Sequence, residues 1–364
     1  MRIVFDARES GTTSGRYVDK LLENLQRIDS VNDYWLLLKS HRLETYTNMP
    51  ANFHTIECNI KEFTFAEQFV LPRIMKKLRP DLVHFPMVQQ PIFYRGKVVT
   101  TMQDLTTLRF RNPTKNQIFF WLKQRAYWLV NFIVPRKSKH VIAISEFTKQ
   151  DVMKTLHFNR PEKFTVTLES ADPMPKPAVP VAEMQDKKFI MYVGRHQPHK
   201  NLDRLIEAHQ KLVSKHPELF LAIVGKKDKT TELLERKAQD RQYKNILFTG
   251  FVSDNQLRWL YEHTACYTFP SLSEGFGLPP LEAMIHGAPV AASNATCIPE
   301  VCGDGAVYFN PYDLDDMAQT IDCVISDKRL ASELVEKGKK QVAKFSWLRM
   351  AEQTLKVYKN TIRN

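Results

Sequence analysis

The regular alternation of short apolar runs with helical patterns limits the folds open to this chain more than any other feature. The runs have the length and β-branched content of strands: RIVFD, YWLLL, DLVHF, KVVTT, HVIAI and FTVTL come first, followed by FIMYVG, LFLAIVG, NILFTG, CYTFP and APVAA. Because each run is followed by a helical pattern, the strands are expected to pair in parallel with helices on both faces. The predicted fold class is α/β.

A proline-rich stretch near the midpoint divides this pattern in two. DPMPKPAVPVAEMQDKK, residues 172–188, has no apolar periodicity, and a chain of 364 residues exceeds the usual size of one domain. We therefore expect an N-terminal domain at 1–173, a linker at 174–187 and a C-terminal domain at 188–345. Residues 346–364 are expected to form a helix that packs back on the first domain. In doubly wound domains, ligands bind at the carboxyl ends of the strands.

The charge of the chain is strongly positive and unevenly placed. The net charge is +12, and residues 71–140 hold fourteen Lys or Arg against two acids. Such a region attracts nucleic acid or anionic lipid headgroups, or is simply a solvated face. The charge alone leaves these alternatives open.

Cysteine content and the N-terminus indicate a reduced, unsecreted protein. The five cysteines are odd in number and include no C-x-x-C pair matched by a second pair, so neither a disulfide framework nor a zinc site is expected. The N-terminal MRIVFDARES resembles a short strand more than a signal peptide, because its apolar run is only three residues long.

Two cations mark the first candidate site. Arg195 and Lys200 follow the run FIMYVG, on a turn that is expected to open a helix near Asn201. Positive side chains beside a helix N-terminus suit a diphosphate, since the helix dipole and the backbone donors also favour negative charge. Surface cations at a helix start are the alternative.

The stretch SLSEGFGLPPLEA supplies the complementary carboxylates. A Gly-rich turn, Gly275 to Gly277, precedes a helix that should begin at Pro279 and hold Glu282 in its first turn. A carboxylate placed there can accept both hydroxyls of a ribose, and Glu274 would face another part of the same ligand. Together with the cations, the pattern predicts a nucleotide-sugar site.

These motifs resemble those of the family 4 retaining glycosyltransferases, which have the GT-B fold. The resemblance rests on SEGFGLPPLEA with GAPVAAS, YVGRHQPHKNLDRLIEA, ILFTGFVSDNQL, IPEVCGDGAVYFNP, HVIAISEFTKQDV and TSGRYVDKLLENL, which cover nearly the whole chain in family order. It implies two Rossmann-like domains that face a central cleft. The similarity is greatest to bacterial mannosyltransferases and related enzymes of polysaccharide assembly.

The resemblance assigns roles to the donor-side residues. The pyrophosphate contacts of the family fall on Arg195 and Lys200, with Gly194 in the same substrate-binding segment, and the ribose ligand falls on Glu282. Glu274 matches the carboxylate beside the transferred sugar. The backbone positions that meet the sugar, the phosphate and the nucleobase are Phe276, Gly277, Leu278 and Val252. The family needs neither metal nor cofactor, and DLDD at 313–316 is expected to be an acid-rich helix start.

In the first domain the match is partial. Gly15 and Arg16 correspond to the family's glycine loop, but Ser14 stands where many relatives have a second glycine, which puts a close approach of the donor phosphate in doubt. Gln103, followed by Asp104, replaces a histidine that contacts the transferred sugar. Glutamine can form hydrogen bonds but cannot titrate. His84 is the nearest replacement candidate, although a packed strand-end histidine is the simpler interpretation.

The implied mechanism retains the anomeric configuration. Arg195 and Lys200 would stabilise the leaving diphosphate, while Gln103 and Glu274 would hold the transferred sugar. No nucleophile stands out, and front-face attack with a diphosphate oxygen taking the acceptor proton is the expected route.

The aromatic stretch at 117–137 bears on location. Lys123, Gln124 and Arg125 interrupt it, which argues against a transmembrane span and leaves a core helix or a helix that dips into a bilayer. Family acceptors are often lipid-linked. The sequence therefore predicts a hexosyltransferase in the cytoplasm, peripheral on an anionic membrane, that uses a GDP-mannose or UDP-sugar donor and a glycolipid or polyprenyl-linked acceptor. Nucleic acid is not an expected partner, and a nucleic-acid-binding protein or an inactive scaffold is the alternative.

Overall fold

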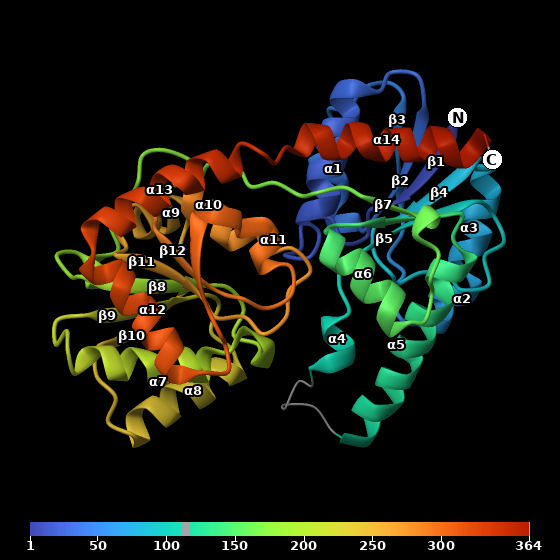
Figure 1. Ribbon diagram of the computed structural model, residues 1–364. Coiled ribbons are helices and arrows are strands. Elements are labelled where there is room, and N and C mark those ends of the chain that lie inside the picture. Colours follow the sequence, from blue (N-terminus) through green and yellow to red (C-terminus); the bar gives the residue numbers. More distant parts are fainter. Residues whose placement is uncertain (111–116, 364) are drawn as a thin grey trace. The chain divides into compact units, whose positions relative to one another are not determined.

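A computed structural model describes residues 1–110 and 117–363, without the side chains of residues 117–120, 122 and 123. The chain forms two compact units. The first unit comprises Met1–Leu108, Gln117–Glu169 and Ser346–Asn364, so both chain ends belong to it (Figure 1). The second unit comprises Ser170–Phe345, together with a short segment that begins at Arg109.

The first unit is built on a parallel seven-stranded sheet of order β3-β2-β1-β4-β5-β6-β7. Its strands are β1 (Arg2–Asp6), β2 (Asp33–Leu38), β3 (Phe53–Glu57), β4 (Leu82–Phe85), β5 (Val98–Met102), β6 (His140–Ala143) and β7 (Phe164–Val166). The central strands β4 and β5 are buried at every position. Such continuous burial is expected where helices cover both faces of a parallel sheet.

Helices surround this sheet in chain order. They are α1 (Arg16–Ile28), α2 (Phe65–Phe69), α3 (Leu71–Leu78), α4 (Thr106–Arg109), α5 (Gln117–Lys137), α6 (Glu146–Thr155) and α14 (Trp347–Arg363). The C-terminal α14 packs against α1, far from it in sequence (Figure 1). Both helices are amphipathic: α1 buries Leu21 and Leu25, and α14 buries Met350 and Tyr358.

The second unit is built on a parallel six-stranded sheet of order β10-β9-β8-β11-β12-β13. Its strands are β8 (Phe189–Val193), β9 (Phe220–Val224), β10 (Ile246–Gly250), β11 (Cys266–Phe269), β12 (Val290–Ser293) and β13 (Ala306–Phe309). Its helices are α7 (Leu202–Val213), α8 (Lys229–Asp240), α9 (Asp254–His263), α10 (Leu278–Ile285), α11 (Ile298–Cys302), α12 (Leu314–Ser326) and α13 (Lys328–Val342).

The strand order reverses once in each sheet. In the first sheet the chain passes from β1 outward to β3 and then returns to place β4 on the other side of β1; in the second, β8 and β11 are related in the same way. The loops that follow the two neighbouring strands at such a reversal point diverge and leave a crevice at the carboxyl edge. The fold thus marks one candidate position in each unit.

The predicted α/β class is confirmed, with two strands added. β3 and β13 were not among the expected strands, and each forms an edge of its sheet. Their inner positions are only partly buried, so polar residues are tolerated and no continuous apolar run develops. The acidic DLDD run does begin a helix, because the Asp313 side chain accepts hydrogen bonds from the amides of Asp315 and Asp316 at the start of α12.

The proline-rich stretch is attached to the second unit. Its Val179 amide donates to the carbonyl of Asn255, and the Arg258 guanidinium donates to the carbonyl of Met174. The contact analysis divides the chain at Glu169, four residues before the expected boundary at 173. The prolines therefore lie along α9 as an ordered segment.

Candidate functional site

Two loops of the second unit meet at the reversal point between β8 and β11. One follows β8 and carries Arg195 and Lys200; the other follows β11 and carries Glu274 and the glycines. The Leu272 amide donates a 2.7 Å hydrogen bond to the His199 carbonyl, which ties the two loops together. The residues that the sequence separates by about seventy positions are thus neighbours in this unit.

The loop after β8 is fixed by its backbone. Gly194 has φ +150°, and a Cβ there would lie 2.6 Å from the Tyr192 hydroxyl, which itself donates to the Arg195 carbonyl. The buried Asn201 adopts a left-handed conformation and donates to the carbonyls of Pro270 and Pro311. These bonds hold the start of α7 against the end of β11.

The two candidate cations differ in their surroundings. The Lys200 ammonium donates to Glu274 Oε1 at 2.5 Å, and the side chains are only 17% and 13% exposed. Arg195 is exposed, and its guanidinium has no hydrogen-bond or ion-pair partner among the described residues. Beside them, burial and then the Lys200 charge lower the pKa of His199 to about 4, so its imidazole is neutral at pH 7.

The Gly-rich loop is held by residues that follow β12. The Cys297 thiol donates to the carbonyls of Glu274 and Phe276, and the Thr296 hydroxyl accepts from the Glu274 amide. The Ser293 hydroxyl donates to the carbonyl of Ser271. Neither Thr296 nor Cys297 was selected from the sequence, because no motif marks them; their role depends on contacts about twenty residues apart in the chain.

Helix α10 begins one residue earlier than expected. Gly277, with φ +94°, is the N-cap, so the helix starts at Leu278 and not at Pro279. Glu282 therefore lies beyond the first turn, which corrects the sequence prediction. A left-handed glycine lets the chain turn into the helix immediately after the loop. The Glu282 carboxylate is buried and accepts a 3.3 Å hydrogen bond from the Tyr261 hydroxyl of α9.

Two further donor-side candidates lie apart or are packed inward. Val252 follows β10, which is two strands away from β8 in the sheet, so it shares the carboxyl edge without adjoining Lys200. The Phe276 side chain is buried, with its ring 5.7 Å from that of Phe345. Only the backbone of Phe276 was assigned to ligand contact, and its buried ring is consistent with that.

In the first unit, Gly15 and Arg16 follow β1 at the reversal point between β1 and β4. Gly15 is the N-cap of α1, and a Cβ at this position would lie only 1.7 Å from the Glu9 carbonyl oxygen. The glycine is therefore required by the fold of its own loop. Arg16 is the first residue of α1 and is half-buried.

A buried ion cluster anchors the same loop. The Arg8 guanidinium donates two hydrogen bonds to the Asp6 carboxylate and one to Glu67 Oε1, at 2.7 to 2.9 Å. It also donates to the Ile60 carbonyl. Sequence reasoning passed over Arg8, because its two carboxylate partners come from a strand end and from α2.

Gln103 and Asp104 follow β5, the neighbour of β4. The Gln103 amide donates to the carbonyl of Pro86 at 3.2 Å, which links it to the loop after β4. The Asp104 carboxylate accepts from the Thr106 amide at 2.7 Å and so caps α4. Asp104 thus has a local structural function in addition to any contact with a ligand.

His84 is a packed residue. It is completely buried, its Nδ1 lies 2.6 Å from the Tyr358 hydroxyl, and its Nε2 lies 2.9 Å from the Thr101 hydroxyl. Burial lowers the pKa of His84 to about 3, which keeps the ring neutral. The idea that His84 replaces the missing site histidine has no support in this geometry.

Glu169 is a titratable residue that the sequence reading missed. It lies three residues beyond β7, its side chain belongs to a residue only 5% exposed, and its carboxylate has no hydrogen-bond partner among the described residues. Burial raises the pKa of Glu169 to about 7, and the positive charge of Arg16 opposes that rise. No local motif surrounds it in the sequence.

Two general searches cover the described residues. Among them, no three His, Cys, Asp or Glu side chains gather in a group that could hold a metal ion. No helix in the described part of the chain is both long enough and apolar enough to cross a membrane.

Comparison with known proteins gives matches in sequence and in fold. Residues 179–341 match the family model "Glycosyl transferases group 1". O-antigen chain mannosyltransferase B of Escherichia coli is 30% identical over 236 residues, which are 61% of this chain and 61% of that protein. The serotype-specific mannosyltransferase WbdA of Escherichia coli is 36% identical over 169 residues, 45% of this chain and 21% of WbdA. Each match thus spans less than two thirds of the relative.

Solved structures match over almost the whole chain. Sucrose-phosphate synthase from Thermosynechococcus elongatus superposes with a TM-score of 0.74 at 18% identity, covering 99% of this chain and 98% of that one. Anabaena Alr3699/HepE, solved in complex with UDP and glucose, gives 0.70 at 15% identity, covering 99% and 100%. These comparisons confirm the GT-B fold and the family resemblance inferred from the motifs.

Proposed function

Because residues 179–341 form a glycosyl transferases group 1 domain, we propose that the protein transfers a hexose from a nucleotide diphosphate sugar to a membrane-associated acceptor. The supporting observation is the convergence of Lys200, Glu274 and the Gly277 helix start at one reversal point of the second sheet. The donor is GDP-mannose or a UDP-sugar. The similarity to two mannosyltransferases favours mannose.

The donor occupies the second unit in this proposal. Its diphosphate lies on Arg195, Lys200 and the segment from Gly194, with the ribose on Glu282. The exposed, unpartnered Arg195 guanidinium supports this, since Arg presents planar donors that match phosphate oxygens. The transferred sugar lies against Glu274 and the backbone of Phe276 to Leu278, and the nucleobase meets Val252.

The Lys200–Glu274 pair gives the site its chemistry. In the unliganded protein the pair neutralises two half-hidden charges. An incoming diphosphate adds negative charge beside Lys200, while Glu274 keeps an oxygen for a sugar hydroxyl. As the glycosidic bond breaks, the charge on the diphosphate grows, and Arg195 and Lys200 stabilise it more strongly in the transition state than in the ground state.

The acceptor binds to the first unit, beside Gly15, Arg16 and Asp104. Gln103 positions the transferred sugar by hydrogen bonds, because an amide cannot exchange a proton near neutral pH. The reaction retains the anomeric configuration, and a diphosphate oxygen takes the proton of the acceptor hydroxyl on the attacked face. Catalysis uses no metal ion, and transfer measured in excess EDTA is expected to equal transfer without it; loss of activity that Mg²⁺ or Mn²⁺ restores would refute this part.

The protein works at the cytoplasmic surface of an anionic membrane. The segment α2–α3 supports this assignment, because it exposes aromatic and cationic side chains together: Phe65 is 85% exposed, Phe69 is 54% exposed, and Arg73, Lys76, Lys77 and Arg79 are exposed on α3. Aromatic residues beside cations suit a lipid headgroup region. We call Phe65, Phe69 and these four cations the α2–α3 surface.

The cations at the end of α5 are less suited to this contact than the sequence suggested. The Arg136 guanidinium donates to the carbonyls of Phe132, Leu156 and His157, and the Lys137 ammonium donates to the carbonyl of Pro91. The side chain of Lys123 lies outside the described residues. Trp121 and Trp128 on α5 are exposed, so α5 contributes aromatic rings rather than free charge.

The test of the proposed function is a screen of UDP-, GDP- and dTDP-sugars by thermal denaturation, followed by a transfer assay with the ligand found. A nucleotide sugar that binds only the native state raises the denaturation midpoint. Binding of RNA or DNA with strong salt dependence, without any effect of a nucleotide sugar, would instead indicate a nucleic-acid-binding protein.

A further inference from the structure

A cationic cavity lies at the opposite edge of the first sheet from Gly15 and Gln103. It has a volume of about 450 Å³ and is lined by Arg136, His157, Phe158, Asn159, Arg160 and Lys163. Arg136 lies just before β6, and the other five lie just before β7. Since all strands of this sheet are parallel, residues that precede strands lie at the amino edge, whereas Gly15 and Gln103 follow strands.

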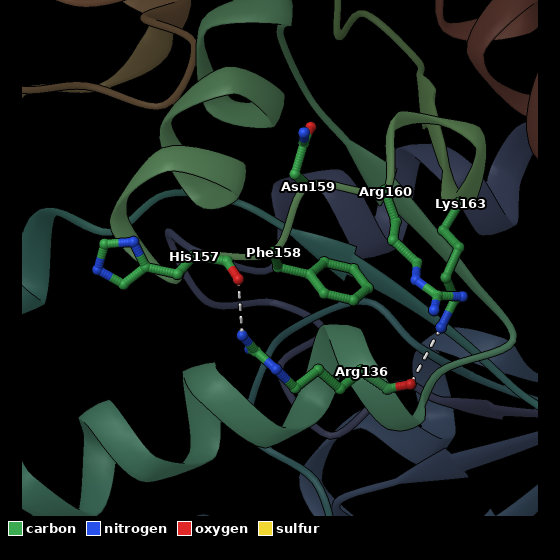
Figure 2. A pocket seen from close by; sticks show the side chains of 6 residues that line it. All are labelled: Arg136, His157, Phe158, Asn159, Arg160 and Lys163. Carbon is green, nitrogen blue, oxygen red and sulfur yellow. Dashed lines mark hydrogen bonds between the residues drawn. The ribbon is translucent and has the colours of Figure 1, made fainter.

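The cavity is assembled from two elements. Figure 2 shows Arg136 extending from α5 toward the His157 carbonyl, while Arg160 and Lys163 extend from the segment between α6 and β7. The Phe158 ring lies among them: the Arg136 guanidinium is 5.2 Å and the Lys163 ammonium 5.4 Å from the centre of that ring. The aromatic ring thus limits the freedom of two of the three cations.

Two of these cations are already fixed by helix carbonyls. Arg136 donates to Phe132, Leu156 and His157, and Lys163 donates to the carbonyls of Pro135 and Arg136 at the end of α5. Cations commonly satisfy the last carbonyls of a helix in this way. Arg160 differs, because it is exposed and its guanidinium has no partner among the described residues.

The positive charge in the cavity is not balanced by ion pairs. None of Arg136, Arg160 and Lys163 forms a salt bridge within the described part of the chain. Burial, followed by the charge of Arg160, lowers the pKa of Lys163; Lys139 acts in the same direction, and the carboxylate of Glu162 opposes them. The cations therefore repel one another, and a bound anion would relieve that repulsion.

We propose that this cavity binds a phosphate group, carried either by a small phosphorylated molecule or by a lipid headgroup. Arg160 supplies the free guanidinium, Lys163 adds the ammonium, and the fixed Arg136 adds positive field without the entropy cost of ordering a free side chain. The volume lies within the range of small-molecule sites. Arginine is the side chain best suited to paired hydrogen bonds with phosphate oxygens. This site is separate from the proposed donor site and does not depend on it.

His157 provides a local probe of the cavity. In protein with ¹³C-labelled histidine, the His157 imidazole resonances are identified by their loss in His157→Gln and followed during titration with inorganic phosphate, with sodium chloride at equal ionic strength as reference. We expect saturable shifts in the wild type that need at least fivefold more phosphate in Arg160→Gln. Lys154→Gln removes an exposed charge from α6 outside the cavity and should leave the titration unchanged.

A second arm identifies the source of the phosphate. Arg160→Gln is expected to reduce retention on phosphatidic acid vesicles if the ligand is a headgroup, and to leave retention unchanged if the ligand is a soluble phosphate compound. Arg160→Gln should keep the wild-type denaturation midpoint and nucleotide-sugar binding, so a failure here is distinct from a failure of the donor site. His157 resonances that respond equally to phosphate and chloride, or equally in wild type and Arg160→Gln, would overturn the proposal.

Discussion

The Lys200 ammonium lies 2.5 Å from Oε1 of Glu274, although the two residues are 74 positions apart in the sequence. Both side chains are largely hidden from solvent. The pair joins the loop after β8 to the loop after β11. A residue proposed for the diphosphate and a residue proposed for the transferred sugar therefore depend on each other before any ligand binds.

Breaking this pair should lower both stability and transfer. Lys200→Ala leaves a poorly solvated carboxylate without its partner, so we expect a loss of about 1–3 kcal/mol in the free energy of unfolding. In Lys200→Ala/Glu274→Gln part of that loss should return, with a coupling energy of about 0.5–3 kcal/mol. Lys211→Ala, which breaks an exposed pair with Asp315, should cost at most about 1 kcal/mol. Denaturant unfolding measures all three, and additive effects of Lys200→Ala and Glu274→Gln would show that the contact carries no energy.

Gln103 should act by hydrogen bonding alone. We expect Gln103→Ala to lose transfer and Gln103→His to keep much of it, since an imidazole can also donate and accept. The histidine variant should gain an ionisation near its unperturbed pKa of about 6.5 in the rate profile, which the wild type lacks at this position. Gln150→Ala, on the exposed side of α6, is the control. Wild-type rates in Gln103→Ala would remove this residue from the site.

Glu169 should make stability depend on pH. Its folded pKa of about 7 lies above the ordinary value of 4.5, so the folded state binds more protons than the unfolded state between these values. Stability should therefore fall as pH rises from about 4.5 to about 7, by a total on the order of 3 kcal/mol. Glu169→Gln cannot titrate, so its denaturation midpoint should lack this part of the decline and exceed that of the wild type at pH 8.

The charged groups that act on Glu169 limit this effect. Arg16 favours the ionised carboxylate, and the buried Tyr17 hydroxyl nearby stays neutral because burial raises its pKa. Glu169→Asp should keep a pH dependence that Glu169→Gln lacks. If wild type and Glu169→Gln decline in parallel over this range, the carboxyl group titrates normally in the folded protein.

The α2–α3 surface should hold the protein on anionic membranes. Lys76→Glu/Lys77→Glu should weaken retention on vesicles that contain anionic lipid at least tenfold, because each nearby cation contributes about 1 kcal/mol. The same change in charge on the second unit, Lys226→Glu/Lys229→Glu, should have little effect. Equal retention on neutral and anionic vesicles at low salt would contradict the electrostatic part of the assignment.

The sequence predicted the repeating parts of the fold and missed the parts made by distant contacts. Buried central strands such as β5 appear as apolar runs, whereas the edge strands β3 and β13 do not. Gly15 was assigned to ligand approach by resemblance, but its place against the Glu9 carbonyl is set by the loop itself.

The candidate site divides in the same way. Motifs located Lys200, Glu274 and Glu282, since these residues follow strands at fixed spacings. Thr296 and Cys297 hold the Gly-rich loop, and neither lies in a recognisable pattern. The position of Glu282 beyond the first turn follows from the left-handed Gly277, a conformation that spacing alone does not specify.

Binding of nucleotide sugars to the wild type and to Glu282 variants tests the central claim most directly. One member of a UDP-, GDP- and dTDP-sugar panel should bind the wild type in calorimetric titration, and Glu282→Ala and Glu282→Gln should each bind it more weakly by about 1–3 kcal/mol, the range for losing a charged hydrogen-bonding partner. Glu232→Ala, an exposed carboxylate on α8, should bind it as the wild type does. No binding by any member of the panel, or wild-type affinity in folded Glu282 variants, would contradict the account.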